Sequence, residues 1–472
     1  MKFINSKILP SIKPKVFTEL HPEFIPAVLA NVEYEKYVNE TKDAQPVKIC
    51  VVRSDQSRTT IETKVFPKRH KLEQENFWYI ERLVKSMLWV YGGYKLIFGG
   101  PKELGMYIKK LYSKKGKQKF DYEIMTTIYD KPFSVEVTSY EKVPNTKEIT
   151  QAIGRHLDGC RIGFDLGASD RKVSAVINGK PIFSEEVIWQ PREHTNWRYH
   201  YHEIMSALHR AAAHLPRVDA IGGSSAGIWV NNKVKVASLF CGIPKKEFKE
   251  ISNIISKIQK YWKVPIIVVN DGEVTALAAS MLLNINSVLG LALGSSEAAG
   301  FVNEKGNITD WLNELAFVPV DFNSSAPVDE WSGDCGCGVQ YFSQQAIFRL
   351  SKKVGIKIPQ YKTLAEKLKF VQEFLEKNDP NAIKIWQAIG IYMGYGIAYY
   401  HRFYNMKHVL ILGRVTLGQG GEIILNKAKE VLSTEFPELA KKIKLHLPDE
   451  KSRRIGQSIA AASLPAIKRP KK

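Results

Sequence analysis

Short apolar runs and longer amphipathic stretches follow one another along most of the chain. The apolar runs have the length of buried strands and include "CRIGFDL", "PIIVVN", "SVLGLAL" and "HVLIL". The amphipathic stretches between them, such as "YHEIMSALHRAAAHL" and "KKEFKEISNIISKIQKYW", have the spacing of helices. Strands that alternate with helices predict an α/β architecture.

The first third of the chain has a pattern of its own. "VKICVVRS" and "TTIETKVFP" predict a β-hairpin, and "NFWYIERLVKSMLWVYG" predicts one long apolar helix. Strand "YKLIFGG", helix "KELGMYIKKLYS" and strand "FSVEVTSY" follow. Aromatic residues at helical spacing are typical of a core, so we expect the long helix to be buried; a partner surface is the alternative.

A second pattern begins at Cys160. "CRIGFDLGAS", "KVSAVING" and "KPIFSEEV" predict three strands joined by tight turns, and Asn178-Gly179 is a strong hairpin signal. The preceding segment "VPNTKEITQAIGRHLDG" predicts a turn and a short helix at a domain boundary.

Small or acidic residues follow three of the predicted strands. They are Asp165 in "FDLGAS", Asp271 in "VVNDGEVTA" and Gly294 in "LALGSSEAAG". Open α/β sheets bind ligands just beyond the carboxyl ends of their strands. Each segment alone could be an ordinary turn, so their order along the chain matters more than any one of them.

In that order, five segments resemble the ROK family of sugar kinases and related repressors, within the actin, hexokinase and Hsp70-like ATPase superfamily. They are "GFDLGASDRKVSAVINGKPI" (first phosphate loop), "AIGGSSAGIWVNNKVKVASLF" (sugar side), "PIIVVNDGEVTALAAS" (catalytic segment), "LGLALGSSEAAGFVNEKG" (second phosphate loop) and "HVLILGRVTLGQGGEIIL" (adenosine loop). The resemblance implies a two-lobed, actin-like (ribonuclease H-like) ATPase fold. Residues 156–275 and 276–472 would form the lobes, and residues 1–155 an additional N-terminal α+β domain of unknown role.

The resemblance also implies an activity, which is ATP-dependent phosphoryl transfer to a sugar hydroxyl, as in glucokinases and other hexose kinases. Asp271 would be the catalytic base, and Asn270 would bind sugar hydroxyls. The alternative for both residues is an N-cap of the following helix. Asp165 would hold Mg²⁺ through water, or be an ordinary turn carboxylate.

Backbone amides of the first loop would reach the phosphates because Gly167, Ala168 and Ser169 are small. Ala168 and Ser169 stand where the family has Gly and Thr. Lys172 would neutralise the transferring group, although a surface lysine is an equally good interpretation.

The second loop, Gly294, Ser295 and Ser296, departs from the family's Gly-Thr-Gly, and Glu297 follows at once. An acid there would repel phosphates unless it points away or meets the metal. In the adenosine loop the family's three glycines are Gly413, Arg414 and a valine. Arg414 could stack on a purine, pair with phosphate or face solvent.

A zinc motif of the family is incomplete here. Phe317 stands at the position of the zinc-binding histidine. When the motif is aligned by its cysteines, Cys335 and Cys337 remain as ligands; when it is aligned by the downstream "YxSxxAI" pattern, Cys337 becomes the third thiol and the two earlier thiols are lost. Zinc needs four ligands, so we expect none to bind.

The sugar side is less well marked. Glu314 matches the family's sugar-binding glutamate, and Gln344 the glutamate that follows the zinc motif when the cysteines are aligned. Ser225 and Asn231 are weaker candidates on the sugar-side loop, where either could simply form turn hydrogen bonds.

Composition narrows the class of protein. The chain has 472 residues and a formal net charge of +20, which favours anionic partners such as nucleotides. Its five cysteines are scattered, and no run is apolar enough for a leader or a membrane span, so we expect a cytoplasmic protein without membrane contacts.

Three functions therefore stay open. The leading one is a sugar kinase that uses ATP and Mg²⁺, with a homodimer as a further expectation. The second is a non-catalytic sugar or nucleotide sensor. The third is a nucleic-acid-binding regulator, but the hairpin and the single long helix near the N-terminus do not fit a winged helix, which argues against it.

Overall fold

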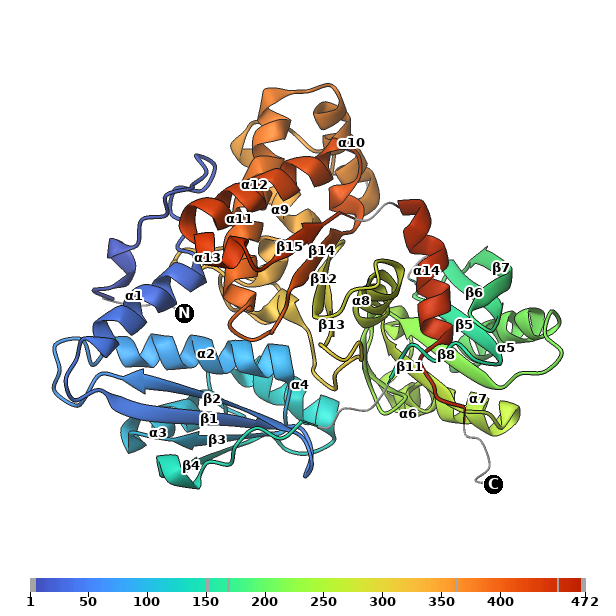
Figure 1. Ribbon diagram of the computed structural model, residues 1–472, viewed down its shortest axis with the longest axis horizontal. Helices are drawn as coiled ribbons and strands as arrows, with labels where there is room; N and C mark the ends of the chain where they lie inside the picture. Colours follow the sequence, from blue (N-terminus) through green and yellow to red (C-terminus); the bar gives the residue numbers. More distant parts are fainter. Residues whose placement is uncertain (1–5, 149–152, 168–169, 361–362, 448–449, 468–472) are drawn as a thin grey trace. The chain divides into compact units, whose positions relative to one another are not determined.

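The computed structural model describes residues 6–148, 153–167, 170–360, 363–447 and 450–467 (Figure 1). The chain divides into two compact units. The first comprises residues 1–149, 291–298 and 310–447, and the second residues 150–290, 299–309 and 448–472.

The N-terminal part of the first unit contains a four-stranded sheet of order β2-β1-β3-β4. β1 (Gln45–Val52) and β2 (Arg58–Val65) form the predicted antiparallel hairpin. β1 also pairs in antiparallel fashion with β3 (Lys95–Gly99), which pairs in parallel with β4 (Ser134–Thr138).

The helices of this part are α1 (Ala27–Asn39), α2 (Glu75–Tyr91), α3 (Lys102–Leu111) and α4 (Lys119–Tyr129), with short 3₁₀ turns η1 (Leu9–Ser11) and η2 (Tyr140–Lys142). The sequence predicted α2 and α3 but missed α1 and α4. α2 is the predicted core helix: Trp89 and Lys85 are both fully buried, and so is nearly every other side chain of the helix.

The rest of the first unit is mainly helical. Its helices are α9 (Gln344–Lys353), α10 (Leu364–Glu376), α11 (Pro380–Tyr400), α12 (Gln419–Glu435) and α13 (Pro437–Ala440), with 3₁₀ turns η5 (Leu315–Phe317), η6 (Gly338–Gln340) and η7 (Arg414–Thr416). A second sheet has the order β13-β12-β14-β15 and comprises β12 (Val288–Leu293), β13 (Glu297–Val302), β14 (His408–Leu412) and β15 (Lys444–His446).

The N-terminal part packs directly on α11. Tyr395 of α11 donates a hydrogen bond to the carbonyl of Val16 at 2.9 Å, and the hydroxyls of Ser86 and Tyr399 are 2.7 Å apart. Helix α1 also contacts α11. The N-terminal segment and the α9–α13 helices therefore share one packed core.

The second unit contains a five-stranded sheet of order β11-β8-β5-β6-β7. β5 (Cys160–Leu166), β6 (Asp170–Ile177) and β7 (Lys180–Ile188) are antiparallel neighbours, as predicted, and Asn178 and Gly179 both have positive φ in the β6–β7 turn. β8 (Ala220–Ser225) and β11 (Ile266–Asn270) continue the sheet in parallel with β5.

Helices and a small hairpin complete this unit. They are α5 (Trp197–Ala212), α6 (Phe248–Ser252), α7 (Ile254–Trp262), α8 (Asp271–Leu282), α14 (Glu450–Ala462), β9 (Ile228–Val230), β10 (Lys233–Val236), η3 (Ser238–Phe240) and η4 (Lys245–Glu247). One face of the sheet packs in a core of buried side chains, which come from β5, β6, β8, α5 and α7. Helix α14 packs against β5 and β8 and against α8.

Two strand glycines let α14 approach the sheet. A Cβ added to Gly222 would lie 1.7 Å from the Ala461 carbonyl oxygen, and one added to Gly163 would lie 2.1 Å from that of Ser458. Both obstacles are helix backbone, which cannot move aside as a flexible side chain could.

Gly222→Ala is therefore expected to destabilise the protein by about 3 kcal/mol, because overpacking forces α14 away from β8. Gly456→Ala, on α14 itself, is the matched control. Its added Cβ would meet only the Ala278 Cβ at 3.8 Å, so a neutral or slightly stabilising effect is expected. Urea unfolding of both variants measures the difference, and equal stabilities would contradict the packing argument.

Part of the segment "VPNTKEITQAIGRHLDG", for which a turn and a short helix were predicted, lies outside the described residues, and its residues 153–159 are not helical. Gly154 and Arg155 have positive φ, and the Arg155 side chain donates to Ser280 Oγ at 2.6 Å and Asn286 Oδ1 at 2.7 Å. Tertiary hydrogen bonds thus hold this segment in an irregular path. Among the described residues, none of the helices has the length and apolar character needed to span a membrane.

Candidate active site

The carboxyl ends of β5, β8 and β11 meet at one edge of the sheet in the second unit. In the parallel register Asp165 is level with Ser224, and Ser224 is level with Val269, two residues before Asp271. The sheet topology therefore brings together the two predicted aspartates, which lie more than a hundred positions apart in the sequence. This juxtaposition is what chemistry between them requires.

The strand-to-helix turn positions Asp271 at the start of α8. Asn270 is the N-cap of α8, because its Oδ1 accepts a hydrogen bond from the Gly272 N–H at 2.7 Å. The Asn270 Nδ2 donates to the Gly227 carbonyl at 2.8 Å. Gly272 is required here, since a Cβ would lie 2.4 Å from the Ala299 carbonyl oxygen. The Asn270 side chain thus fixes the turn that carries Asp271.

Electrostatics distinguish the two aspartates. Burial raises the pKa of Asp271 to about 6, and the neighbouring Asp165 carboxylate contributes to the shift. Burial also raises the pKa of Asp165, but the Lys172 ammonium, 3.8 Å from Asp165 Oδ2, opposes this. Asp271 therefore titrates near neutrality, in the range of a general base.

Lys172 makes a closer ion pair with Asp170, at 2.9 Å. It therefore lies between two acidic side chains at the start of β6, and it is not a freely solvated surface lysine. Its charge is already partly compensated, and an anion would have to compete with both carboxylates.

The first phosphate loop is held at Gly167. Its N–H donates to the Asp170 carbonyl at 2.9 Å, and its own carbonyl accepts from Trp189 Nε1 at 2.8 Å. The predicted loop residues Ala168 and Ser169 lie outside the described residues. Trp189 was not predicted from the sequence, because it lies in none of the recognised motifs.

The sugar-side candidates differ in their surroundings. Ser225 ends β8 and is fully buried, with its hydroxyl 3.4 Å from the Ala226 carbonyl. Asn231 is exposed in the β9–β10 turn at positive φ. Its neighbour Asn232 makes the structural contacts, donating to Ile266 and accepting from the Val268 N–H.

The second phosphate loop belongs to the first unit. Ser295 and Ser296 are exposed, and the Gly294 N–H donates to the Ser296 carbonyl at 3.0 Å. The Gly294 carbonyl accepts from the N–H of Gln344, the first residue of α9, at 2.9 Å. Gln344 therefore contacts the second phosphate loop, a neighbour that the sequence analysis did not assign to it.

The adenosine loop lies against the end of β12, the strand that precedes the second phosphate loop. Gly413 has a φ of +106°, and a Cβ on it would lie 2.4 Å from the Leu293 carbonyl oxygen. Only glycine fits so close to the residue before Gly294. Arg414, the next residue, is exposed, and its carbonyl accepts a hydrogen bond from Gln372.

The backbone of the predicted sugar-binding acid, Glu314, contacts α2. The N–H of Glu314 donates to the Trp89 carbonyl at 2.9 Å. Phe317, at the position implied for the zinc-binding histidine, packs on the Trp89 ring with centroids 4.2 Å apart. An aromatic contact thus occupies this position.

Buried charges lie next to the cysteine pair. Asp334, adjacent to Cys335, pairs with Arg82 at 2.9 Å and with Lys85 at 3.1 Å, and Arg82 also pairs with Glu81. Lys85 contacts Asp121 at 3.2 Å. We call these five charged residues, Glu81, Arg82, Lys85, Asp121 and Asp334, the α2 ion network.

The thiol of Cys337 is fully buried, and burial raises its pKa well above the ordinary range, so it stays protonated. Within the part of the chain that is described, no group of three or more His, Cys, Asp or Glu side chains could hold a metal ion.

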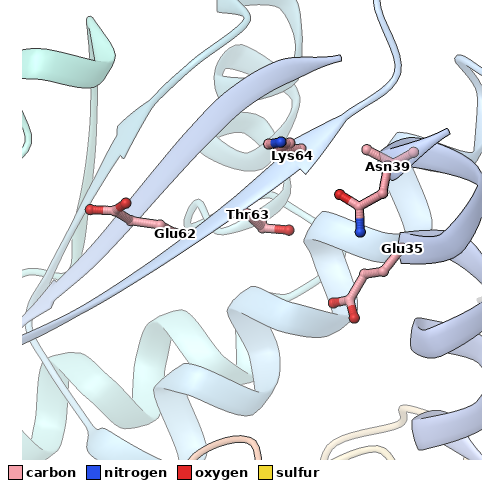
Figure 2. Close-up of a pocket in the computed structure, with 6 residues that line it drawn as sticks. Glu35, Asn39, Glu62, Thr63 and Lys64 are labelled. Carbon is pink, nitrogen blue, oxygen red and sulfur yellow. The ribbon is translucent and has the colours of Figure 1, made fainter. Parts of the chain in front are cut away.

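A polar pocket of about 260 Å³ lies between α1 and β2 in the first unit (Figure 2). Glu35 and Asn39 of α1 and Glu62, Thr63 and Lys64 of β2 line it, together with Val38. Glu35 pairs with Arg402 and accepts from Tyr79, so its carboxylate is already satisfied. None of the predicted site residues lines this pocket.

Solved structures share the architecture described above. A ROK hexokinase from Thermus thermophilus matches with a TM-score of 0.50 and 17% sequence identity, over 64% of this chain and 97% of that chain. This chain has the ROK fold. The predicted fold class and the resemblance behind it are thus confirmed.

Other ROK structures also match. A glucokinase from Streptomyces griseus, solved with glucose and AMPPNP, has a TM-score of 0.47 at 17% identity and covers 64% of this chain and 99% of its own. A ROK transcriptional regulator, a homolog of the E. coli MLC protein, has a TM-score of 0.49 at 17% identity, with 68% and 82% covered. No protein-family model and no curated protein sequence matches the chain.

A shared fold does not by itself decide the activity of a protein. The site residues of this chain must carry that argument.

Proposed function

We propose that this protein is an ATP-dependent phosphotransferase that acts on a sugar hydroxyl. The observation that carries the proposal is Asp271: a carboxyl at the end of a buried strand, beside Asp165, with a pKa raised to about 6. Such a group is ionised at neutral pH yet basic enough to take a proton from an alcohol in the transition state.

In the proposed reaction, the sugar hydroxyl oxygen attacks the γ-phosphorus of ATP and passes its proton to Asp271. A new O–P bond forms while the bond from the γ-phosphorus to the bridging oxygen breaks, and ADP leaves with that electron pair. The turn set by Asn270 and Gly272 holds Asp271 rigidly, so little reorientation is needed.

The acidic side chains fit a hydrated Mg²⁺, which takes oxygen ligands. Asp165 is largely buried, and the amine of Lys172, which lies near it, is shared with Asp170. Asp165 would hold the ion through water, and the ion would supply positive charge to the phosphates. Lys172, Gly167 and the loop of Gly294, Ser295 and Ser296 would contact phosphates, and Gly413 and Arg414 the adenosine.

The pKa of Asp271 makes the rate depend on pH. The base must be ionised, so kcat/KM is expected to rise tenfold per pH unit below about pH 6 and to level off above it. A coupled assay over pH 4.5 to 8, with sugar and ATP well below saturation, measures this profile. A flat profile through pH 6 would contradict the role of Asp271.

A second candidate is the non-catalytic sugar or nucleotide sensor. It is favoured by Phe317, which packs against the Trp89 ring and stands at the position that the resemblance assigns to a sugar-contacting histidine. A panel of hexoses and N-acetylated sugars with ATP separates the two functions. Turnover of any sugar supports the kinase, whereas ligand-dependent thermal shifts without turnover support the sensor. Cytoplasmic localisation and a homodimer stay predictions from the sequence.

A further inference from the structure

Glu297 is a buried acid that directly follows the second phosphate loop. Ser295 and Ser296 are exposed, whereas Glu297, the first residue of β13, is only 2% exposed. The backbone alternation of a strand turns its side chain inward, away from the surface of the loop. The acid therefore points away from any phosphate on the loop, yet its charge would still lie close by.

Only one oxygen of this carboxyl has a hydrogen-bond partner among the described residues. Its Oε1 accepts a hydrogen bond from Tyr400 of α11 at 3.1 Å, and its Oε2 has no hydrogen-bond partner among the described residues. Gly338 of η6 leaves room for it, because a Cβ there would lie 2.3 Å from Oε2 and 2.7 Å from the Leu315 carbonyl oxygen.

Among the residues that the structure describes, the titratable groups that influence Glu297 are a phenol and an acid, and neither carries a positive charge. Tyr400 on α11 and Glu314 just before η5 are the titratable groups that influence it, and Glu314 is itself an acid. Burial raises the pKa of Glu297 to about 8, and Glu314 adds to the shift. Glu297 is therefore mostly uncharged at pH 7.

We infer that Glu297 is a positioning residue of the second phosphate loop. The loop binds nucleotide phosphates while the Glu297 carboxyl is protonated, and it binds them more weakly once that carboxyl has lost its proton. The inference rests on the proposed function, since it assumes that Gly294, Ser295 and Ser296 bind phosphate. A carboxylate one residue from the loop would repel phosphate, because the protein interior screens charge poorly. By linkage, bound phosphate in turn strengthens proton binding at Glu297.

ADP binding measured by calorimetry at pH 7.5, 8.5 and 9.5 tests this directly. Phosphate itself stays fully ionised over this range because its second pKa is about 6. We expect the Kd for ADP to rise about sixfold between pH 7.5 and pH 9.5, as an increase of about one unit in the pKa of Glu297 on binding would produce. In Glu297→Gln the affinity should equal that of the unsubstituted protein at pH 7.5 and stay flat.

Two further variants sharpen the test. Tyr400→Phe removes the hydrogen bond that stabilises the carboxylate, so the pH at which affinity falls should move upward. Asp321→Asn alters another buried acid, whose pKa burial raises to about 6, and should leave the pH dependence unchanged.

A second readout needs no nucleotide. The ordinary pKa of Glu297 is 4.5 and its folded value about 8, so the folded state binds more protons between these values and its stability falls as pH rises through them. The melting temperature of Glu297→Gln should therefore exceed that of the unsubstituted protein by a margin that grows from pH 5 to pH 8 and is constant above.

The outcomes separate the inference from the proposed function. ADP that binds with the same affinity at every pH, or a pH dependence that survives in Glu297→Gln, overturns the role of Glu297 and leaves the kinase proposal standing. Absence of ADP binding at every pH overturns both.

Discussion

Replacing Asp271 by Asn is expected to lower kcat for phosphoryl transfer by about 10³-fold, because an amide cannot take the proton of the attacking hydroxyl. The substitution is nearly isosteric. The N-cap of α8 is kept, because Asn270 still accepts the hydrogen bond from the Gly272 N–H. ADP affinity should therefore stay within twofold. The loss would show in kcat from a coupled assay with the sugar that the panel identifies.

Folding provides the control for this variant. Burial and Asp165 disfavour the Asp271 carboxylate, so the neutral amide should melt at the same temperature or higher. Asp219→Asn, just before the opposite end of β8, is the matched substitution and should leave kcat unchanged. A 271 variant that folds, binds ADP and retains a tenth or more of its activity would exclude Asp271 as the base.

The second large effect is expected on stability, in the α2 ion network. Replacing Lys85 by Met should destabilise the protein by about 3–5 kcal/mol, because it leaves the carboxylates of Asp121 and Asp334 buried and short of a counter-charge. Burial works against the charged form of Lys85, yet the two acids more than offset it and raise the pKa of Lys85 above its ordinary value. Urea unfolding measures the change.

An exposed ion pair in the same part of the chain is the control. Lys68 and Glu103 pair at 2.6 Å, but both side chains are about two thirds exposed. Lys68→Met should therefore have little effect on stability, as is usual for surface pairs. If the two lysine variants were equally stable, the α2 ion network would contribute no more to the free energy of unfolding than a surface contact does.

This network also explains how the N-terminal segment is joined to the rest of its unit. Gln118 donates to Glu81 at 2.7 Å, and Trp89 donates to Asp121 at 2.9 Å, so every acid has a neutral partner as well as a charged one. Asp334 comes from the segment with the two remaining cysteines. A lysine and an arginine of α2 thus supply the positive charge beside a motif that resembles an incomplete zinc site.

Much of the architecture could be predicted from local patterns. The strands β5, β6 and β7, the Asn178-Gly179 turn and helix α8 all lie where the pattern of apolar residues and turn signals put them. Such elements are encoded by nearby residues, and the order of their loops was enough to indicate the ROK fold.

Other features could not be predicted from local patterns, because the residues that cause them are distant in sequence. No local pattern explains why Gly222, within β8, must be a glycine: it leaves room for α14, which follows more than two hundred residues later. Residues 153–159 were expected to be helical and are instead held by side-chain contacts of Arg155. Charged residues in an apolar helix, Arg82 and Lys85, were a signal that the sequence analysis did not use.

The sequence by itself determined which chemical groups are available and the order in which strands present them, since hydrophobic period and turn residues act over a few positions. Only the tertiary structure decided their environments. Parallel pairing through β8 brought Asp165 beside Asp271, and packing against Tyr400 and Gly338 buried Glu297. Ionisation depends on burial and on neighbouring charges, and both of these are set by residues that meet only when the chain is folded.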